Sequence, residues 1–148
     1  MASLSLFQLL FCAKECERQN SGEMSVYHMT QGLEWLLRKG GLPELLNEPE
    51  LILHLGLFIE PEKNGNGYRT VPVQVGGSLI PFETIEYQIV NLCHHGRNLS
   101  CREFYKEFEE IHPFIDGNGR VGALLYNLID ESLYLPTNPP DVFAKEEV

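Results

Sequence analysis

The amino-acid sequence predicts a mainly α-helical protein that carries one β-hairpin. Apolar residues recur at three- and four-residue spacing along most of the chain, which is typical of amphipathic helices. Between residues 70 and 82 this spacing is replaced by two β-branched or apolar runs flanking Gly76-Gly77, which predicts two strands joined by a tight turn. With 148 residues, 43% of them hydrophobic, the chain is expected to form a single domain over residues 1–148.

In the first half of the chain we expect four helices. The first covers residues 3–18, and its predicted core face consists of Leu6, Leu9, Leu10 and Ala13. The second starts at Ser25, a candidate N-cap, and ends at Gly40-Gly41. Pro43 and Pro49 each suit the first turn of a further short helix, the second of which continues to Phe58.

After the hairpin the helical spacing returns. One helix ends at His94-His95-Gly96, and Ser100 followed by Glu103 forms a capping box that begins the next. A last helix begins near Asn118 and is followed by an irregular tail over residues 136–148. Its predicted core face, which excludes Arg120, is made of Val121, Leu124, Leu125, Leu128 and Ile129.

The predicted hairpin has two prolines, Pro72 and Pro81, which cannot donate to a strand ladder and therefore place it at an edge. An open edge beside an active site could accept a peptide as an additional strand. The alternative is a hairpin without a role in binding. The candidate docking residues are Val71, Val73, Val75, Gly76, Gly77 and Leu79.

The net charge of −10, without a local basic stripe, argues against a nucleic-acid partner. An anionic ligand must then be held by oriented N–H groups, a single arginine or a divalent cation. The four cysteines lack metal-binding spacing and are expected to be reduced thiols. The apolar run 4–11 is too short for a membrane span and lacks signal-peptide features, so we expect a buried helix there, no membrane partner and a cytoplasmic protein.

Residues 112–120 place a base, a carboxylate, a glycine-rich loop and a cation next to one another. Pro113 ends the preceding helix, which leaves the imidazole of His112 free to act as a general base. The loop Gly117-Asn118-Gly119 and the following helix N-terminus can cradle an anion, assisted by Arg120. Asp116 can supply the carboxylate that Mg²⁺ uses together with polyphosphate oxygens. The segment therefore predicts a phosphate-handling site.

The sequence His112-Pro113-Phe114-Ile115-Asp116-Gly117-Asn118-Gly119-Arg120 resembles the signature His-Pro-Phe-x-Asp/Glu-Gly-Asn-Gly-Arg-x-x-Arg of the Fic family (the Fic/Doc or Fido fold). Gly67-Tyr68-Arg69 and the hairpin are similar to the family's flap region, so that the resemblance covers about residues 50–132.

The resemblance implies a Fic-type helical fold with a β-hairpin flap beside the active-site loop. It also implies transfer of AMP from ATP, with Mg²⁺, to a Ser, Thr or Tyr hydroxyl of a target protein. In this chain His112 would be the base, Asp116 the metal ligand, Gly117, Asn118, Gly119 and Arg120 the nucleotide-binding residues, and the hairpin the target-docking flap. Such a protein acts in a bacterial cytoplasm or after delivery into a host cell.

One position departs from the signature, because its second arginine is replaced by Ala123. A missing charge-assisted contact costs about 1.5–3 kcal/mol, so ATP would be held more weakly. The family's inhibitory motif is also incomplete, since Thr30 and Glu34 are followed by Trp35. Two alternatives therefore stay open: a Fic-fold enzyme with another nucleotide or phosphate-containing donor, and a catalytically weak Fic-fold binding protein.

Overall fold

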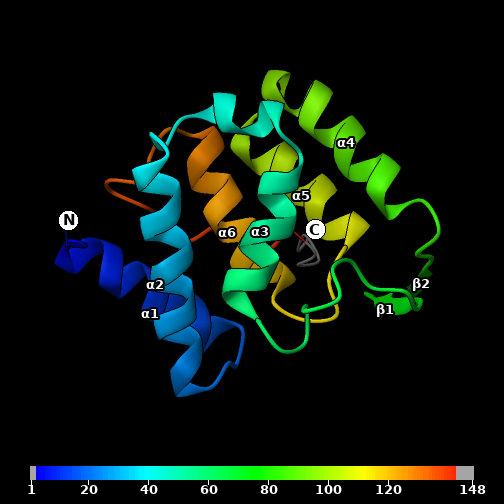
Figure 1. The fold of residues 1–148 in the computed structure, drawn as a ribbon, viewed down its shortest axis with the longest axis horizontal. Coiled ribbons are helices and arrows are strands. Elements are labelled where there is room, and N and C mark those ends of the chain that lie inside the picture. The colour runs from blue at the N-terminus through cyan, green and yellow to red at the C-terminus, as the bar shows by residue number, and fades with distance from the viewer. Residues whose placement is uncertain (1–2, 143–148) are drawn as a thin grey trace, which may run out of the picture.

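The computed structural model describes residues 3–142 as a helical body with a hairpin at one end (Figure 1). The described elements are α1 (Leu6–Arg18), α2 (Glu23–Arg38), the 3₁₀ helix η1 (Pro43–Asn47), α3 (Glu50–Ile59), β1 (Val73–Val75), β2 (Ser78–Ile80), α4 (Ile85–His95), the 3₁₀ helix η2 (Gly96–Asn98), α5 (Cys101–Ile111) and α6 (Asn118–Ile129). The prediction of a mainly α-helical fold with a two-stranded hairpin is confirmed.

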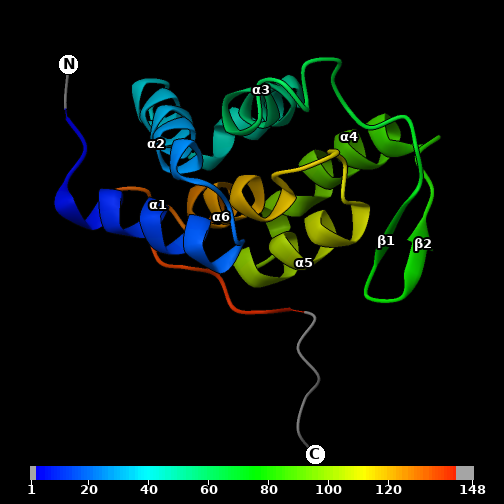
Figure 2. The same ribbon diagram turned by 90° about the horizontal axis from the view of Figure 1, so that it is seen from below.

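Helix α6 lies at the centre of the body, in contact with α1, α3 and α5 (Figure 2). Helix α2 bridges α1 and α3, while α4 packs on the other side of α5. The predicted core face of α6 is buried except for Ile129, which is partly exposed. Arg120, which was expected to lie outside this face, is buried too. The turn at residues 112–117 therefore leads directly into the most enclosed helix.

Several predicted helix ends are confirmed. The hydroxyl of Ser100 accepts from the N–H of Glu103 at 3.1 Å, and the Glu103 carboxylate accepts from the N–H of Ser100 at 3.2 Å. Helix α4 ends at His95, as expected. The predicted start of the second helix was wrong: α2 begins at Glu23 with Gly22 as its N-cap, and Ser25 is buried inside the first turn.

The predicted core face of α1 was also wrong. Leu6, Leu9, Leu10 and Ala13 are exposed. The buried side of the helix carries Gln8, Phe11, Cys12, Glu15 and Cys16. The reason is that the segment following α6 supplies partners for the polar side chains. The Nε2 of Gln8 donates to the carbonyl of Leu133 at 3.0 Å, and a Glu15 carboxylate oxygen accepts from Asn138 at 2.8 Å.

The hairpin has the predicted two-residue turn. Val75 lies opposite Ser78, so that Gly76 and Gly77 alone connect the strands. Their φ angles of 56° and 87° are the positive values that a type I′ turn requires, which explains the glycine pair. Within residues 3–142 the sheet contains these two strands only, and each therefore has one edge without a neighbouring strand.

The remaining segments add two observations. Residues 136–142 contain no helix or strand, and residues 143–148 of the predicted irregular tail lie outside the described part of the chain. Among the described helices, none combines the length and the apolar character that a membrane crossing needs.

Candidate active site

His112 caps the C-terminal end of α5 in a left-handed backbone conformation, with φ 50° and ψ 61°. This region is unfavourable for a residue with a β-carbon, and such strain is commonly found at functional sites. The conformation breaks the helix and turns the backbone into the loop. The N–H of His112 still donates to the carbonyl of Phe108 at 3.0 Å, which fixes the turn on the end of α5.

The imidazole of His112 is kept in the form that a base requires. Burial lowers the pKa of His112 below its ordinary value, and the nearby Arg69 guanidinium acts in the same direction. The backbone carbonyl of Glu109 and the carboxylate of Asp116 oppose this effect without reversing it. The ring is therefore neutral at pH 7, and its buried Nδ1 has no hydrogen-bond partner among the described residues.

The loop after His112 is closed by Phe114 and Asn118. Phe114 is fully buried, and its ring lies so close to the backbone of Gly56 on α3 that any larger residue there would overlap it. The side chain of Asn118 accepts from the N–H of Phe114 and donates to its carbonyl, both at 2.9 Å. Because the Asn118 side chain is used in this way, it shapes the loop, and only its backbone can face a ligand.

The N-terminus of α6 points backbone N–H groups into the loop. Gly117, the N-cap, has φ 84°, and a β-carbon at this position would lie 2.6 Å from Ile59. Glycine is therefore required for both its backbone angle and its size. The N–H groups at the start of a helix lack intrahelical partners and favour an anion.

Arg120 is a buried cation with free donors. Only 3% of its surface is exposed, and its Nη2 pairs with Glu60 at 2.9 Å and lies 3.5 Å from Asp116. Its Nε and Nη1 atoms have no hydrogen-bond partner among the described residues. Buried guanidinium donors left unpaired are costly, so Arg120 favours an additional anionic partner.

Asp116 holds its carboxylate at the mouth of the site. One oxygen accepts from Lys63 at 2.7 Å and the other from the N–H of Gly117 at 2.7 Å. Burial acts to raise the pKa of Asp116, but Lys63, the Gly117 N–H and Arg120 together lower it. The ionised carboxylate fits Mg²⁺, which needs one such ligand when phosphate oxygens complete its shell, provided that Lys63 moves aside. No group of three or more His, Cys, Asp or Glu side chains in residues 3–142 could hold a metal by itself.

The structure brings the predicted residues together around one cavity of about 180 Å³. Its walls are formed by His112, Asp116, Gly117, Asn118, Gly119 and Arg120, together with Gln19, Glu109 and Ile115. The predicted flap residues do not belong to this lining. Of these, Val71 and Leu79 are largely exposed, and the hairpin lies beside the C-terminal end of α5 (Figure 2).

Arg69 connects the hairpin to His112. Its buried guanidinium donates to the carbonyls of Ile111 and His112 on the site, at 3.1 and 2.6 Å. On the hairpin side it donates to the carbonyls of Val71, Ile80 and Pro81, at 2.7, 3.3 and 2.9 Å. This role of Arg69 could not be predicted from the sequence, because backbone carbonyl partners leave no pattern in the side chains.

Two further residues in the cavity wall were missed by sequence reasoning. Gln19, the C-cap of α1, lies over Gly119, where a β-carbon would come within 2.4 Å of its carboxamide. Glu109 is buried on α5 with its Oε1 unpaired among the described residues, and burial together with the nearby Glu15 raises its pKa to about 7. Both positions depend on how α1 packs against α5 and α6, which local patterns do not predict.

Ala123, where the signature has its second arginine, is fully buried in the hydrophobic core and does not line the cavity. A neutral imidazole, a helix N-terminus and a buried arginine thus lie around one cavity of this helical protein, an arrangement that suits an anionic ligand. A family model described as the Fic/DOC family matches residues 50–129, more than half of the chain. The chain belongs to the Fic/DOC family.

Proposed function

We propose that this protein transfers AMP from ATP to a Ser, Thr or Tyr hydroxyl of a target protein and releases pyrophosphate. The observation that carries the proposal is Arg120, a buried cation with two donor atoms unpaired among the described residues, which lines the same cavity as His112 and the N-terminal residues of α6. This combination suits a phosphate chain placed next to a base, and members of the Fic family are usually transferases.

In the proposed reaction, the neutral ring of His112 removes the proton from the target hydroxyl. The hydroxyl oxygen then forms a bond to the α-phosphorus while the bond from that phosphorus to the pyrophosphate oxygen breaks. Arg120 and the backbone N–H groups of Gly117, Asn118 and Gly119 bind the phosphates and offset the charge that develops on them. Asp116 would hold Mg²⁺, which when bound supplies positive charge to the phosphate oxygens.

The hairpin is the proposed docking site for the target. Each strand has an open edge, to which an extended target segment could add through backbone hydrogen bonds. The exposed side chains of Val71 and Leu79 would then contact the target. An ATP donor and the four free cysteines, including the buried Cys12, Cys16 and Cys93, support a cytoplasmic location for the reaction.

A second candidate is a Fic-fold protein that uses another phosphate-containing donor or binds nucleotide with little catalysis. It is favoured by two observations. Ala123 removes one cation of the family signature, and Gln19 lies over Gly119 in a cavity smaller than most ligand pockets, which have about 300–1,000 Å³.

The test uses the purified protein with a cell lysate and ATP labelled at the α or the γ phosphate. Transfer of the α label to a protein band, and its absence with His112→Asn, is the expected result. Transfer of the γ label alone would establish phosphotransfer instead. If neither label is transferred while labelled ATP still binds, the protein is a nucleotide-binding member of the family.

A further inference from the structure

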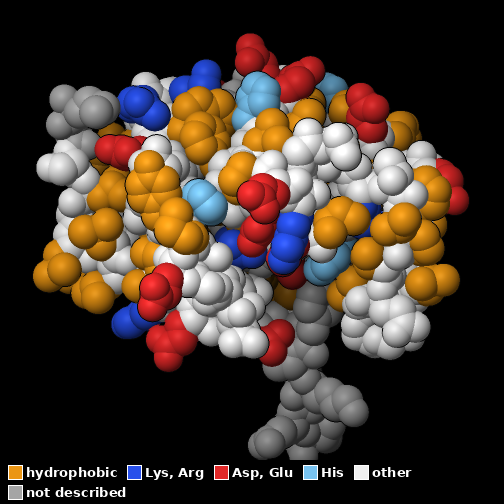
Figure 3. Space-filling view, turned by 60° about the horizontal axis from the view of Figure 1, so that its bottom comes forward, with side chains coloured by type: hydrophobic (Ala, Val, Ile, Leu, Met, Phe, Trp, Pro, Cys, Tyr) orange, Lys and Arg blue, Asp and Glu red, His pale blue; other side chains and the backbone are white. Residues whose placement is uncertain are grey.

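The outer side of α1 carries an apolar ridge that is exposed to solvent. The exposed fractions of Leu6 and Phe7 are 69% and 63%, and those of Leu9 and Leu10 are 43% and 46%. A capping box between Ser5 and Gln8 fixes the start of the helix that presents them. In Figure 3 hydrophobic side chains gather at the edge of the molecule formed by α1.

The outward orientation of this ridge is fixed by the opposite face of α1. Gln8 and Glu15 are buried there. Gln8 donates a hydrogen bond to the carbonyl of Leu133, and Glu15 accepts one from the side chain of Asn138. Rotating the helix to bury the leucines would break these bonds and leave polar groups unpaired inside the protein, which is costly. The apolar residues therefore stay outside in the isolated chain.

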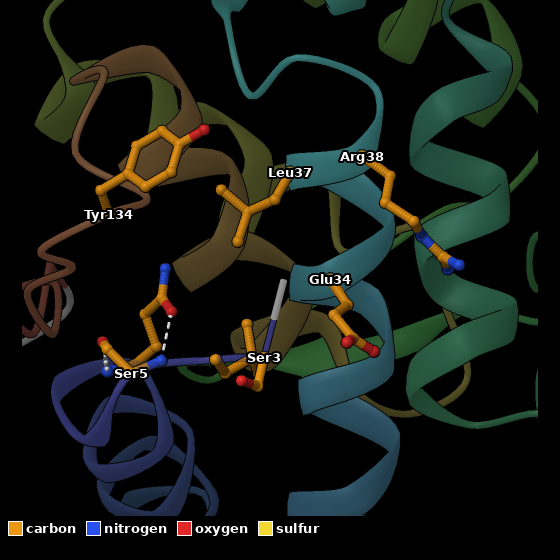
Figure 4. Close-up of a pocket in the computed structure, with 8 residues that line it drawn as sticks. Ser3, Ser5, Glu34, Leu37, Arg38 and Tyr134 are labelled. Atoms are coloured by element: carbon orange, nitrogen blue, oxygen red, sulfur yellow. Dashed lines mark hydrogen bonds between the residues drawn. The ribbon is translucent and has the colours of Figure 1, made fainter. Parts of the chain in front are cut away.

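The apolar surface continues from α1 onto the segment that follows α6. Tyr134 and Leu135 are 70% and 63% exposed, directly after the Leu133 carbonyl that binds Gln8. Figure 4 shows Tyr134 next to the N-terminal end of α1, where Ser5 and Tyr134 border one cavity of about 350 Å³. We call these six residues the α1 patch: Leu6, Phe7, Leu9, Leu10, Tyr134 and Leu135.

From this arrangement we propose that the α1 patch is a self-association surface, occupied by the α1 patch of a second copy of this chain in a two-fold dimer. A two-fold interface requires a surface that is complementary to itself, and two apolar helix ridges crossing each other meet this requirement. Most soluble oligomers are closed homo-oligomers of this type.

Charge favours a second copy over a lipid surface. The chain carries a net charge of −10, so an anionic membrane would repel it. Residues 3–14 contain no acidic residue, although the chain has 21, and the first turn of α1 is free of them too. The α1 part of the patch is therefore free of carboxylates, and the acidic residues nearest to the patch, Glu34, Asp130 and Glu131, lie at its border.

The area is sufficient for a weak dimer. With roughly 150–250 Å² for a whole large side chain, the exposed fractions amount to on the order of 600 Å² per copy. Two copies would bury about 1,200 Å², which is the lower end for specific interfaces. We therefore expect a dissociation constant on the order of micromolar, and an association that strengthens with salt because screening reduces the repulsion between the acidic bodies.

The test is sedimentation velocity on the full chain over about 5–200 µM, the range in which a micromolar dimer changes its population. The double variant Leu6→Glu/Leu10→Glu is expected to raise the dissociation constant at least ~100-fold, since unpaired carboxylates would be desolvated at the interface. The matched control is Tyr87→Glu on α4, which is exposed to a similar extent, at 73%, and should still dimerise.

A charge exchange tests the two-fold pairing directly. The variant Leu6→Lys/Leu10→Lys should be monomeric alone and should form a mixed dimer with Leu6→Glu/Leu10→Glu. Circular dichroism checks that each variant is folded. A wild-type chain that stays monomeric at 200 µM, a dimer that survives the glutamate substitutions, or flotation of a monomeric chain with neutral phosphatidylcholine vesicles would each overturn the proposal.

Discussion

His112 combines a strained backbone with a depressed pKa, and these two properties can be separated by mutation. Asparagine tolerates the left-handed conformation better than alanine does. We therefore expect His112→Asn to reduce single-turnover AMP transfer by about 10²–10⁴-fold while leaving the unfolding free energy unchanged. His112→Ala should lose the same activity and, in addition, up to about 1 kcal/mol of stability in urea unfolding. Equal activity of the wild type and His112→Asn would exclude this residue as the base.

The pH dependence of transfer follows from the same residue. Because the pKa of His112 lies below the ordinary value of 6.5, more than half of the rings are still neutral at that pH. We expect kcat/KM to fall with decreasing pH with its midpoint below pH 6.5. The check is the rate of α-label transfer over pH 5–8, and a fall centred above pH 6.5 would contradict the assignment.

Glu109 is expected to make stability depend on pH. Its pKa is raised to about 7 in the folded chain from an ordinary value of 4.5, so the folded state holds a proton that the unfolded state has released between these values. The contribution of Glu109 is therefore fully present below pH 4.5 and is lost as the pH rises to about 7.

Glu109→Gln should remove this pH-dependent loss in the free energy of unfolding, which amounts to about 3 kcal/mol as an upper bound. Urea unfolding at pH 5 and pH 8 measures it. The control is Glu110→Gln, an exposed neighbour on α5, which should behave as the wild type does. An unchanged difference between the two pH values in Glu109→Gln would show that Glu109 is ionised in the folded chain.

At the scale of elements, the hairpin is tied to α5 by one side chain. Arg69 donates five hydrogen bonds to carbonyls on both elements. Lysine keeps the positive charge but cannot reproduce the planar set of N–H donors of the guanidinium group. We expect Arg69→Lys to lower the unfolding free energy by about 2–4 kcal/mol, since several buried carbonyls lose their donors.

The substitution Arg69→Lys should also increase the rate of amide hydrogen exchange, both in residues 71–81 and in residues 111–112. The control Arg102→Lys concerns an exposed arginine on α5. Faster exchange in the hairpin with unchanged exchange at residues 111–112 would show that Arg69 does not couple the two elements.

Helix α6 changes what is expected from restoring the second arginine of the family signature. From the sequence, Ala123→Arg should add a cation and strengthen ATP binding. Since Ala123 is fully buried in the core, the larger charged side chain has to be accommodated by repacking, with an expected stability loss of about 1–3 kcal/mol or more. Thermal unfolding and ATP titration of the same variant separate the two effects, and an unchanged Tm would show that the side chain reaches the cavity.

Over the whole molecule, the parts predictable from sequence are those fixed by neighbouring residues. The capping box of Ser100, the glycine turn of the hairpin and the loop before α6 all depend on local chemistry, and the structure gathers residues 112–120 around one cavity. The rotation of α1 could not be predicted in this way, because it depends on Leu133 and Asn138, more than 120 residues away. The placement of Gln19 over Gly119 has the same cause.

The Arg69 connection leaves the side chains of the hairpin free to vary. All five partners of its guanidinium are backbone carbonyls, which every amino acid possesses. The side chains at positions 71, 80 and 111 can therefore be replaced without removing a hydrogen-bond acceptor. If the hairpin docks the target as proposed, recognition can diverge there while the backbone at His112 stays in place, so that a new target does not require a new arrangement of the site.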